Sequence, residues 1–142
     1  KLIDHFNLGR SYYFNKQFFE ADSAYAKATD LSPNWASAWL SRADANVQID
    51  STSEEGLAKP YFEKYIEIAE ADSANPSKYN NGLSTAYGYL AYYYILKKDN
   101  QNALMYLKKK HQLVLDPVEK KSVDTGIDQI LNPQKYQKQN KK

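Results

Sequence analysis

Two motifs decide the fold of this chain: Leu8-Gly9-x-x-Tyr12 and, after a short polar turn, Ala21-x-x-x-Tyr25-x-x-Ala28 with Pro33 behind it. Within each motif the residues recur about three or four positions apart, so they share one face of a helix. The small side chains of Gly9, Ala21 and Ala28 let two helix backbones approach closely, and the aromatic rings fill the space beside that contact. Pro33 ends the pair, because proline cannot continue a helix and suits the first position of the next one. We therefore expect a helix–turn–helix unit here.

The same combination of small and bulky residues returns twice further along the chain. Trp39 and Ala43 carry it in a second unit, and Tyr87 and Ala91 carry it in a third. Between these two units, the segment 72–82 is rich in Asn and Ser, and we expect it to be an interhelix loop and the only internal hinge. The expected helices are 3–15, 18–30, 35–49, 55–70, 84–97, 101–115 and 118–131.

These spacings resemble the tetratricopeptide repeat (TPR), whose copies stack into a solenoid. The resemblance implies an all-α fold, a right-handed α-α superhelix of three helix pairs plus a C-terminal capping helix. The solenoid would span 1–131, with repeats at about 2–35, 36–72 and 84–117, a cap at 118–131 and a disordered basic tail at 132–142. One departure is His5, which stands where the family usually has tryptophan. The tyrosine- and lysine-rich, cysteine-free composition resembles the TPR domains of bacterial proteins.

Composition and charge narrow the classes of function. The formal net charge is +2, so nothing in it favours a nucleic-acid or membrane partner. Residues 1–96 carry 8 basic and 12 acidic side chains and residues 97–142 carry 11 and 5, but the basic part has no arginine to interleave with its aromatic residues. No apolar run reaches the length of roughly 18 residues that a membrane span needs. Because Lys1 lies within a helical pattern, we expect a processed chain or a fragment.

Residues suited to catalysis or metal binding are scarce. The two histidines, His5 and His111, lie far apart, and there is no cysteine to complete a metal site. The five glycines form neither a phosphate-binding loop nor a nucleophile elbow. The acidic residues follow helix-surface spacings, such as Glu63 and Glu67, which are typical of a solvated helix face. We therefore expect no enzyme activity, no catalytic residue, no metal and no cofactor.

The resemblance implies a partner-binding surface instead. In a TPR superhelix the first helix of each pair lines the concave groove, and its groove-facing positions here are Phe6, Arg10, Tyr13, Leu40, Asp44, Val47, Thr85, Tyr92 and Ile95. This mixture of aromatic, apolar and charged residues matches the chemistry of protein and peptide hot spots. The expected function is a non-catalytic protein–protein interaction module or scaffold that binds a peptide or protein segment. A role of Phe6, Leu40 and Ile95 as core between repeats stays open.

One type of TPR groove is not expected. Clamps that hold the acidic C-terminal tails of heat-shock chaperones use lysines and asparagines, whereas Phe6, Ser41 and Thr85 stand at those positions here. Asp44 would also repel a carboxylate.

Three alternatives remain open. The fold could be a plain helical bundle. The domain could belong to a cell-envelope protein and bind glycans or accompany an enzyme, with Tyr13 and Tyr92 stacking on sugar rings. It could also self-associate through its N-terminal edge, where Leu2, Phe18 or Phe19 would be exposed. The sequence does not indicate a compartment.

Overall fold

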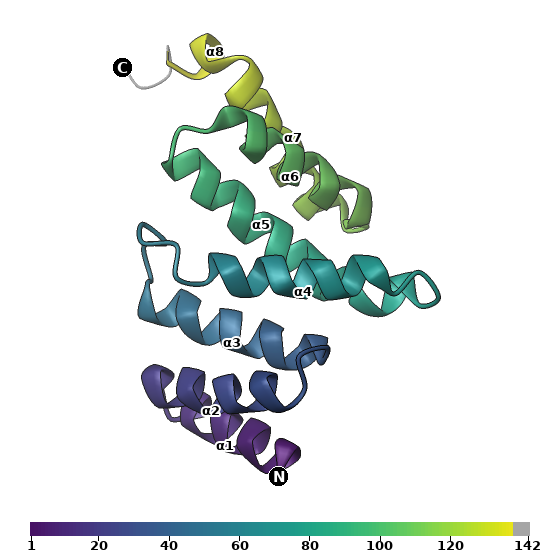
Figure 1. Ribbon diagram of the computed structural model, residues 1–142. Coiled ribbons are helices and arrows are strands. Elements are labelled where there is room, and N and C mark those ends of the chain that lie inside the picture. Colours follow the sequence, from purple (N-terminus) through teal and green to yellow (C-terminus); the bar gives the residue numbers. More distant parts are fainter. Residues whose placement is uncertain (138–142) are drawn as a thin grey trace. The chain divides into compact units, whose positions relative to one another are not determined.

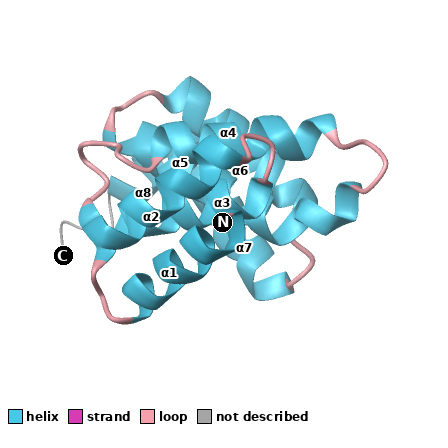
Figure 2. Cartoon of the chain, turned by 60° about the horizontal axis from the view of Figure 1, so that its bottom comes forward, coloured by secondary structure: helices cyan, strands magenta, loops and turns pink. Residues whose placement is uncertain are grey.

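The computed structural model describes residues 1–137 of the 142-residue chain. Over this range the backbone forms helices joined by turns and loops, and contains no strand (Figure 2). The chain divides into two compact units, one of which is Lys1–Gly82 while the other begins at Leu83. This division falls within a helix, directly after the segment that the sequence predicts to be a hinge.

The first unit contains four α-helices and a short 3-10 turn: α1 (Leu2–Phe14), α2 (Phe18–Leu31), α3 (Ala36–Ile49), α4 (Lys59–Ala71) and η1 (Pro76–Tyr79). Each α-helix packs against the next one along the chain (Figure 1). The α1–α2 contact depends on Gly9, because a Cβ atom there would lie 2.6 Å from the ring of Tyr25. Ala43 of α3 is also fully buried. The predicted close approach of helices at small residues is confirmed in this unit.

The second unit is built mainly from α5 (Asn80–Leu96), α6 (Asn100–Leu113), α7 (Pro117–Leu131) and α8 (Pro133–Gln137). Helices α5 and α6 meet through Tyr94 and Tyr106, whose rings stack with centroids 5.9 Å apart and planes at 8°. Ala91, Leu107 and Val123 form a buried cluster from three successive helices. Ala91, the third small residue of the repeat pattern, is therefore in the core as predicted.

Aspartates cap two helices of the second unit. The side chain of Asp99 accepts a hydrogen bond from the Asn102 backbone at 3.1 Å, and that of Asp116 accepts one from the Glu119 backbone at 2.8 Å. Each bond satisfies a backbone N–H that has no partner within its helix. Pro117 follows Asp116 at the first helical position, where its missing N–H costs nothing. These local signals fix where α6 and α7 begin.

The loop before α4 is longer than the sequence indicates. The expected helix starts at residue 55, but α4 begins at Lys59. The physical reason is the buried carboxylate of Asp50, which accepts hydrogen bonds from the backbone N–H groups of Gly56 at 2.8 Å and Leu57 at 3.3 Å. Gly56 has a φ of 73°, a left-handed conformation that an α-helix does not contain.

The interhelix loop expected at 72–82 is shorter than predicted. Pro76–Tyr79 forms η1, and the Asn-Asn-Gly sequence that follows is the first turn of α5 rather than a turn between helices. Tyr65 of α4 is a large residue, and it is only 4% exposed although the repeat usually has a small residue at its position. A Cβ atom on Gly82 would collide with the phenol of Tyr65. The missing side chain of Gly82 therefore provides the space that Tyr65 fills.

The C-terminal tail also differs in part from the expectation of disorder over 132–142. Pro133–Gln137 forms α8, and Asp128 of α7 holds it. The carboxylate of Asp128 accepts hydrogen bonds from Lys135 at 2.7 Å and from the Tyr136 hydroxyl at 2.6 Å. This shared acceptor explains why a polar segment adopts a defined position. The last five residues of the expected tail, 138–142, lie outside the described residues.

Candidate functional site

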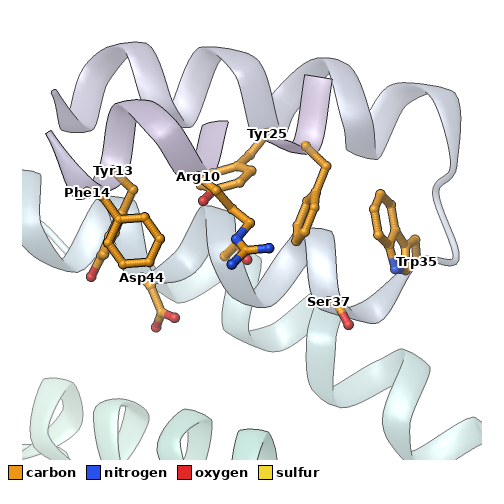
Figure 3. A pocket seen from close by; sticks show the side chains of 9 residues that line it. Arg10, Tyr13, Phe14, Tyr25, Trp35, Ser37 and Asp44 are labelled. Atoms are coloured by element: carbon orange, nitrogen blue, oxygen red, sulfur yellow. The ribbon is translucent and has the colours of Figure 1, made fainter. Parts of the chain in front are cut away.

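The first unit has a pocket of about 430 Å³ between the side chains of α1 and α3. This volume lies within the range of roughly 300–1,000 Å³ that is usual for ligand sites. The lining residues are Phe6, Arg10, Tyr13, Phe14, Tyr25, Trp35, Ser37, Ser41 and Asp44. Tyr25 of α2 is the only buried one among them, at 2% exposure, so its ring forms part of the pocket's base (Figure 3). We call this the groove pocket.

Five aromatic side chains give the groove pocket its walls. The ring of Phe6 lies 4.5 Å from that of Trp35 and 5.6 Å from that of Tyr25, measured between centroids. At the other end of the pocket, the rings of Tyr13 and Phe14 meet edge to face with centroids 6.2 Å apart. Phe14 is 74% exposed, so much of its ring is available to a bound molecule. Large rings with few rotatable bonds are typical of the residues that dominate protein interfaces.

The groove pocket contains one cation and one anion that do not pair with each other. Within residues 1–137, no ion pair or hydrogen bond joins the Arg10 guanidinium or the Asp44 carboxylate to another side chain. Burial raises the pKa of Asp44 from 3.8 to about 6. Arg10 instead acts on Tyr25, where its positive charge partly opposes the rise in the pKa of the phenol that burial causes. The carboxylate is therefore partly desolvated without a compensating charge from the protein.

Four of the nine predicted groove residues line the groove pocket: Phe6, Arg10, Tyr13 and Asp44. Leu40 and Val47 of α3 are partly buried and do not line it. Thr85, Tyr92 and Ile95 belong to the second unit, where all three are exposed on α5. The pocket therefore brings together only these four residues of the predicted surface.

Five lining residues were not among the predicted binding residues, although Ser41 was noted at a clamp position: Phe14, Tyr25, Trp35, Ser37 and Ser41. A signal for two of them was present, because Ser37, Ser41 and Asp44 recur at intervals of four and three on one face of α3. Tyr25 matched the core position of the repeat motif, and it does belong to the core cluster with Ala21 and Ala45. Its ring serves both the core and the pocket, which spacing alone does not reveal.

A second, smaller pocket of about 300 Å³ lies between α1 and α2. Its lining residues include Leu8, which is 46% exposed, and Phe19, which is 70% exposed. Of the three residues expected at an exposed N-terminal edge, Phe19 is exposed, whereas Leu2 and Phe18 are partly buried. Self-association through this edge therefore has an exposed aromatic side chain to use, but it stays a prediction.

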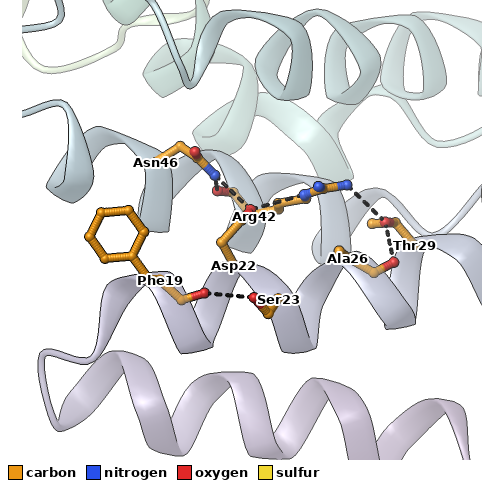
Figure 4. A network of polar contacts seen from close by, with 7 residues as sticks. All are labelled: Phe19, Asp22, Ser23, Ala26, Thr29, Arg42 and Asn46. Carbon is orange, nitrogen blue, oxygen red and sulfur yellow. Dashed lines mark hydrogen bonds and ion pairs between the residues drawn. The ribbon is translucent and has the colours of Figure 1, made fainter.

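A polar network joins α2 to α3 on another side of the first unit (Figure 4). The Arg42 guanidinium donates to Asp22 at 2.9 Å and lies 4.2 Å from the ring centroid of Tyr61. Asn46 donates to the same carboxylate oxygen of Asp22 at 2.7 Å. All of these side chains are partly or fully buried, so the network fixes the α2–α3 contact. Sequence reasoning missed it, since the hydrogen-bonded partners are 20 and 24 residues apart.

Residues 1–137 contain no group of three or more His, Asp or Glu side chains placed to hold a metal ion. In the same range, every helix is too short or too polar to cross a bilayer. His111, one of the two histidines, instead contacts Asp124 at 3.0 Å.

The chain is similar to proteins of solved structure. The chain matches no model of a known protein family and no curated protein. It does match the solved structure of the C-terminal part of a TPR repeat-containing protein from Cytophaga hutchinsonii, with 38% sequence identity and a TM-score of 0.78. The chain has the fold of a tetratricopeptide repeat domain. The match covers 89% of this TPR domain and 47% of the Cytophaga chain, so this domain spans about half of that length.

A second solved structure supports the TPR fold. The N-terminal domain of stress-induced protein-1 from Caenorhabditis elegans has 21% identity and a TM-score of 0.68, over 88% of this chain and 93% of that one. At this identity the likeness concerns the fold alone. The fold class predicted from the sequence, an all-α solenoid of the TPR type, is confirmed, and the Cytophaga match agrees with a domain of bacterial type.

Proposed function

We propose that this TPR domain is a non-catalytic interaction module that binds a peptide or protein segment in the groove pocket. Its fold is one that serves protein–protein interaction in general. The observation that carries the finer proposal is the composition of the pocket: aromatic walls, two serine hydroxyls, and two opposite charges that lack partners among residues 1–137. Such a site offers both apolar contact area and orienting polar groups.

The pocket's shape favours a chain segment over a small metabolite. It is open to solvent along the row of side chains from Trp35 to Phe14, which a peptide can cross (Figure 3). Phe14 and Arg10 are both exposed at its rim. Exposed rings can pack against side chains of a bound segment, whereas a small metabolite is usually enclosed on most sides. This preference supports peptide binding over catalysis.

The proposal can be tested by blocking the pocket without touching the core. Ser37 lines the groove pocket and is exposed, so a Ser37→Trp variant fills the pocket from its rim. Gln48→Trp is the matched control, because Gln48 is exposed on the same helix and does not line the pocket. Random 12-residue peptides displayed on phage would be selected on the wild-type domain, and the recovered peptides would be measured by fluorescence polarisation.

We expect peptides that bind the wild type and Gln48→Trp alike and bind Ser37→Trp at least tenfold more weakly. Circular dichroism and urea unfolding would establish that both variants are folded. If selection yields no binders, or if Ser37→Trp binds every peptide as tightly as the wild type, the groove pocket is not the binding site and the proposal fails.

Self-association is a second candidate, and the exposure of Phe19 beside the α1–α2 pocket favours it. Light scattering over a concentration series would detect a dimer. A Phe19→Glu variant should shift any dimer to monomer, because it places a charge in an apolar contact. A wild-type protein that stays monomeric at millimolar concentration would remove this candidate.

A further inference from the structure

The carboxylate of Asp44 is an incomplete ion-binding group. It lies in the groove pocket on α3, partly buried, and no cation or hydrogen-bond donor among residues 1–137 contacts it. Burial raises its pKa to about 6, so at pH 7 the group is still mostly ionised. A desolvated charge without a partner is unfavourable in the free protein, and a ligand that supplies the opposite charge offsets this cost.

Two aromatic side chains lie at the same end of the pocket as this carboxylate. Figure 3 shows Asp44 at the same end of the pocket as Tyr13 and Phe14. Burial, and to a smaller extent the negative charge of Asp44, raises the pKa of the Tyr13 phenol. Ring faces attract cations, and the hydrocarbon stem of a lysine or arginine packs well against them. The Asp44 end of the pocket thus combines a carboxylate with apolar aromatic walls.

The same domain already contains a completed version of this arrangement. The carboxylate of Asp22 pairs with Arg42 at 2.9 Å, and the Arg42 guanidinium lies over the ring of Tyr61 at 4.2 Å. Carboxylate, guanidinium and ring thus form one set within the first unit. At Asp44 the carboxylate and the rings are present, and the cation is the component that the chain does not supply.

The other charged groups around Asp44 do not take that role. Arg10 of α1 lines the same pocket, but it acts on Tyr25 and does not lower the pKa of Asp44. On α3 itself, Arg42 pairs with Asp22. The lysines of α4 that face acidic residues pair within that helix: Lys59 with Glu63 at 2.7 Å and Lys64 with Glu67 at 2.7 Å. Burial is the only cause of the raised pKa of Asp44.

We propose that the Asp44 end of the groove pocket accepts a lysine or arginine side chain of the bound segment, with its charge on Asp44 and its stem against Tyr13 and Phe14. This inference rests on the proposed function and specifies the chemistry of the partner. It makes the preferred partner a segment with a basic residue, in contrast to an acidic tail. Arg10, further along the pocket, then contacts a backbone carbonyl or an acidic residue of the same segment.

The test extends the peptide selection to variants of Asp44. The same random 12-residue library is selected in parallel on the wild type, on Asp44→Asn and on Asp44→Lys. Asp44→Asn keeps the size of the side chain and removes its charge. Each recovered peptide is then synthesised with its basic residue and with glutamine in its place, and all four combinations of protein and peptide are measured. Such a cycle isolates the pairwise contribution of the two charges.

We expect lysine or arginine to be enriched at one position of the wild-type peptides, and acidic residues to be enriched with Asp44→Lys. Asp44→Asn should weaken a basic peptide at least tenfold, while the glutamine version of that peptide should bind both proteins equally. Lowering the pH from 7.5 to 5 should also weaken the basic peptide on the wild type, because protonation removes the charge of Asp44. The affinity of Asp44→Asn should not change over that range.

The possible failures are distinguishable. Peptides that Ser37→Trp abolishes but that show no basic enrichment, and that bind Asp44→Asn as tightly as the wild type, would overturn this inference and leave groove binding intact. If no recovered peptide is sensitive to Ser37→Trp, groove binding fails and this inference fails with it.

Discussion

Replacing Asp44 with asparagine should make the domain more stable at neutral pH and leave its stability at pH 4 nearly unchanged. The pKa of this carboxyl is about 6 in the folded protein, against 3.8 without the burial. A group with a raised acidic pKa binds more protons in the folded state than in the unfolded state between these two values, so it lowers the free energy of unfolding as the pH rises through that window. Above pH 6 the penalty is fully present.

The size of the effect follows from the shift. Each pKa unit corresponds to about 1.4 kcal/mol, so a shift of roughly two units gives at most about 3 kcal/mol. Since Asp44 is only partly buried, solvent screening reduces this, and we expect a gain of about 1–2 kcal/mol at pH 7. The gain should fall below about 0.5 kcal/mol at pH 4, where the wild-type carboxyl is protonated.

Urea unfolding of the wild type and Asp44→Asn at pH 4, 5, 6 and 7 measures the difference directly, and the other carboxyl groups cancel in it. Glu55→Gln provides the control, since Glu55 is an exposed acidic residue in the loop before α4. Its substitution should change the free energy of unfolding by no more than about 0.5 kcal/mol. A stability difference for Asp44→Asn that is absent at pH 7, or equal at pH 4 and pH 7, would refute the idea that Asp44 is an uncompensated charge.

The remaining predictions concern the fold. Arg42→Ala should lower the free energy of unfolding, measured by urea titration, by about 1–3 kcal/mol, because it leaves Asp22 partly buried without its cation. The double variant Arg42→Ala, Asp22→Ala should lose less stability than the sum of the two single variants. Gly9→Ala should destabilise the domain by about 1–3 kcal/mol, because the added methyl group would lie too close to the ring of Tyr25. Gly126→Ala should stabilise the domain by up to about 1 kcal/mol, because the nearest side-chain atom to its Cβ, in Leu107, would lie 3.7 Å away. Equal changes in stability for Gly9→Ala and Gly126→Ala would contradict the idea that packing decides the difference. Hydrogen bonds from Lys135 and Tyr136 hold the pKa of Asp128 well below its usual range, so these contacts with α8 should persist at neutral pH and be lost in strong acid. Asp128→Asn should therefore speed amide hydrogen exchange at 133–137. Unchanged exchange would show that other contacts hold α8.

Much of the fold could be predicted from the sequence because its signals are local. The spacing within each motif predicted a helix pair, and the small residues Gly9, Ala21 and Ala28 predicted that its helices pack closely. The largest differences between predicted and observed helix ends are four residues: α5 begins at Asn80 instead of 84, and α4 begins at Lys59 instead of 55. There, the decisive group is Asp50, whose bonds to the backbone of Gly56 and Leu57 depend on how the loop folds back. Nothing in the spacing of these residues indicates that contact.

The candidate site could be predicted only in part, for a related reason. The resemblance to the tetratricopeptide repeat led to Phe6, Arg10, Tyr13 and Asp44, because it implies which face of the first helix of each pair lines the groove. It does not show which side chains of two helices meet, so Trp35 was missed although its ring lies 4.5 Å from that of Phe6. The charge state of Asp44 was also beyond the sequence, since it depends on burial in three dimensions.

The large side chain of Tyr65 occupies the space that Gly82 leaves free, and this has a consequence for engineering the domain. Changing position 65 alone to the alanine that a standard repeat would carry leaves a void beside Gly82, and truncating a buried tyrosine to alanine costs several kcal/mol. Enlarging position 82 alone forces a clash with the phenol. Consensus design, which chooses the residue at each position independently, would therefore lower the stability of the domain at this contact. Positions 65 and 82 have to be redesigned together.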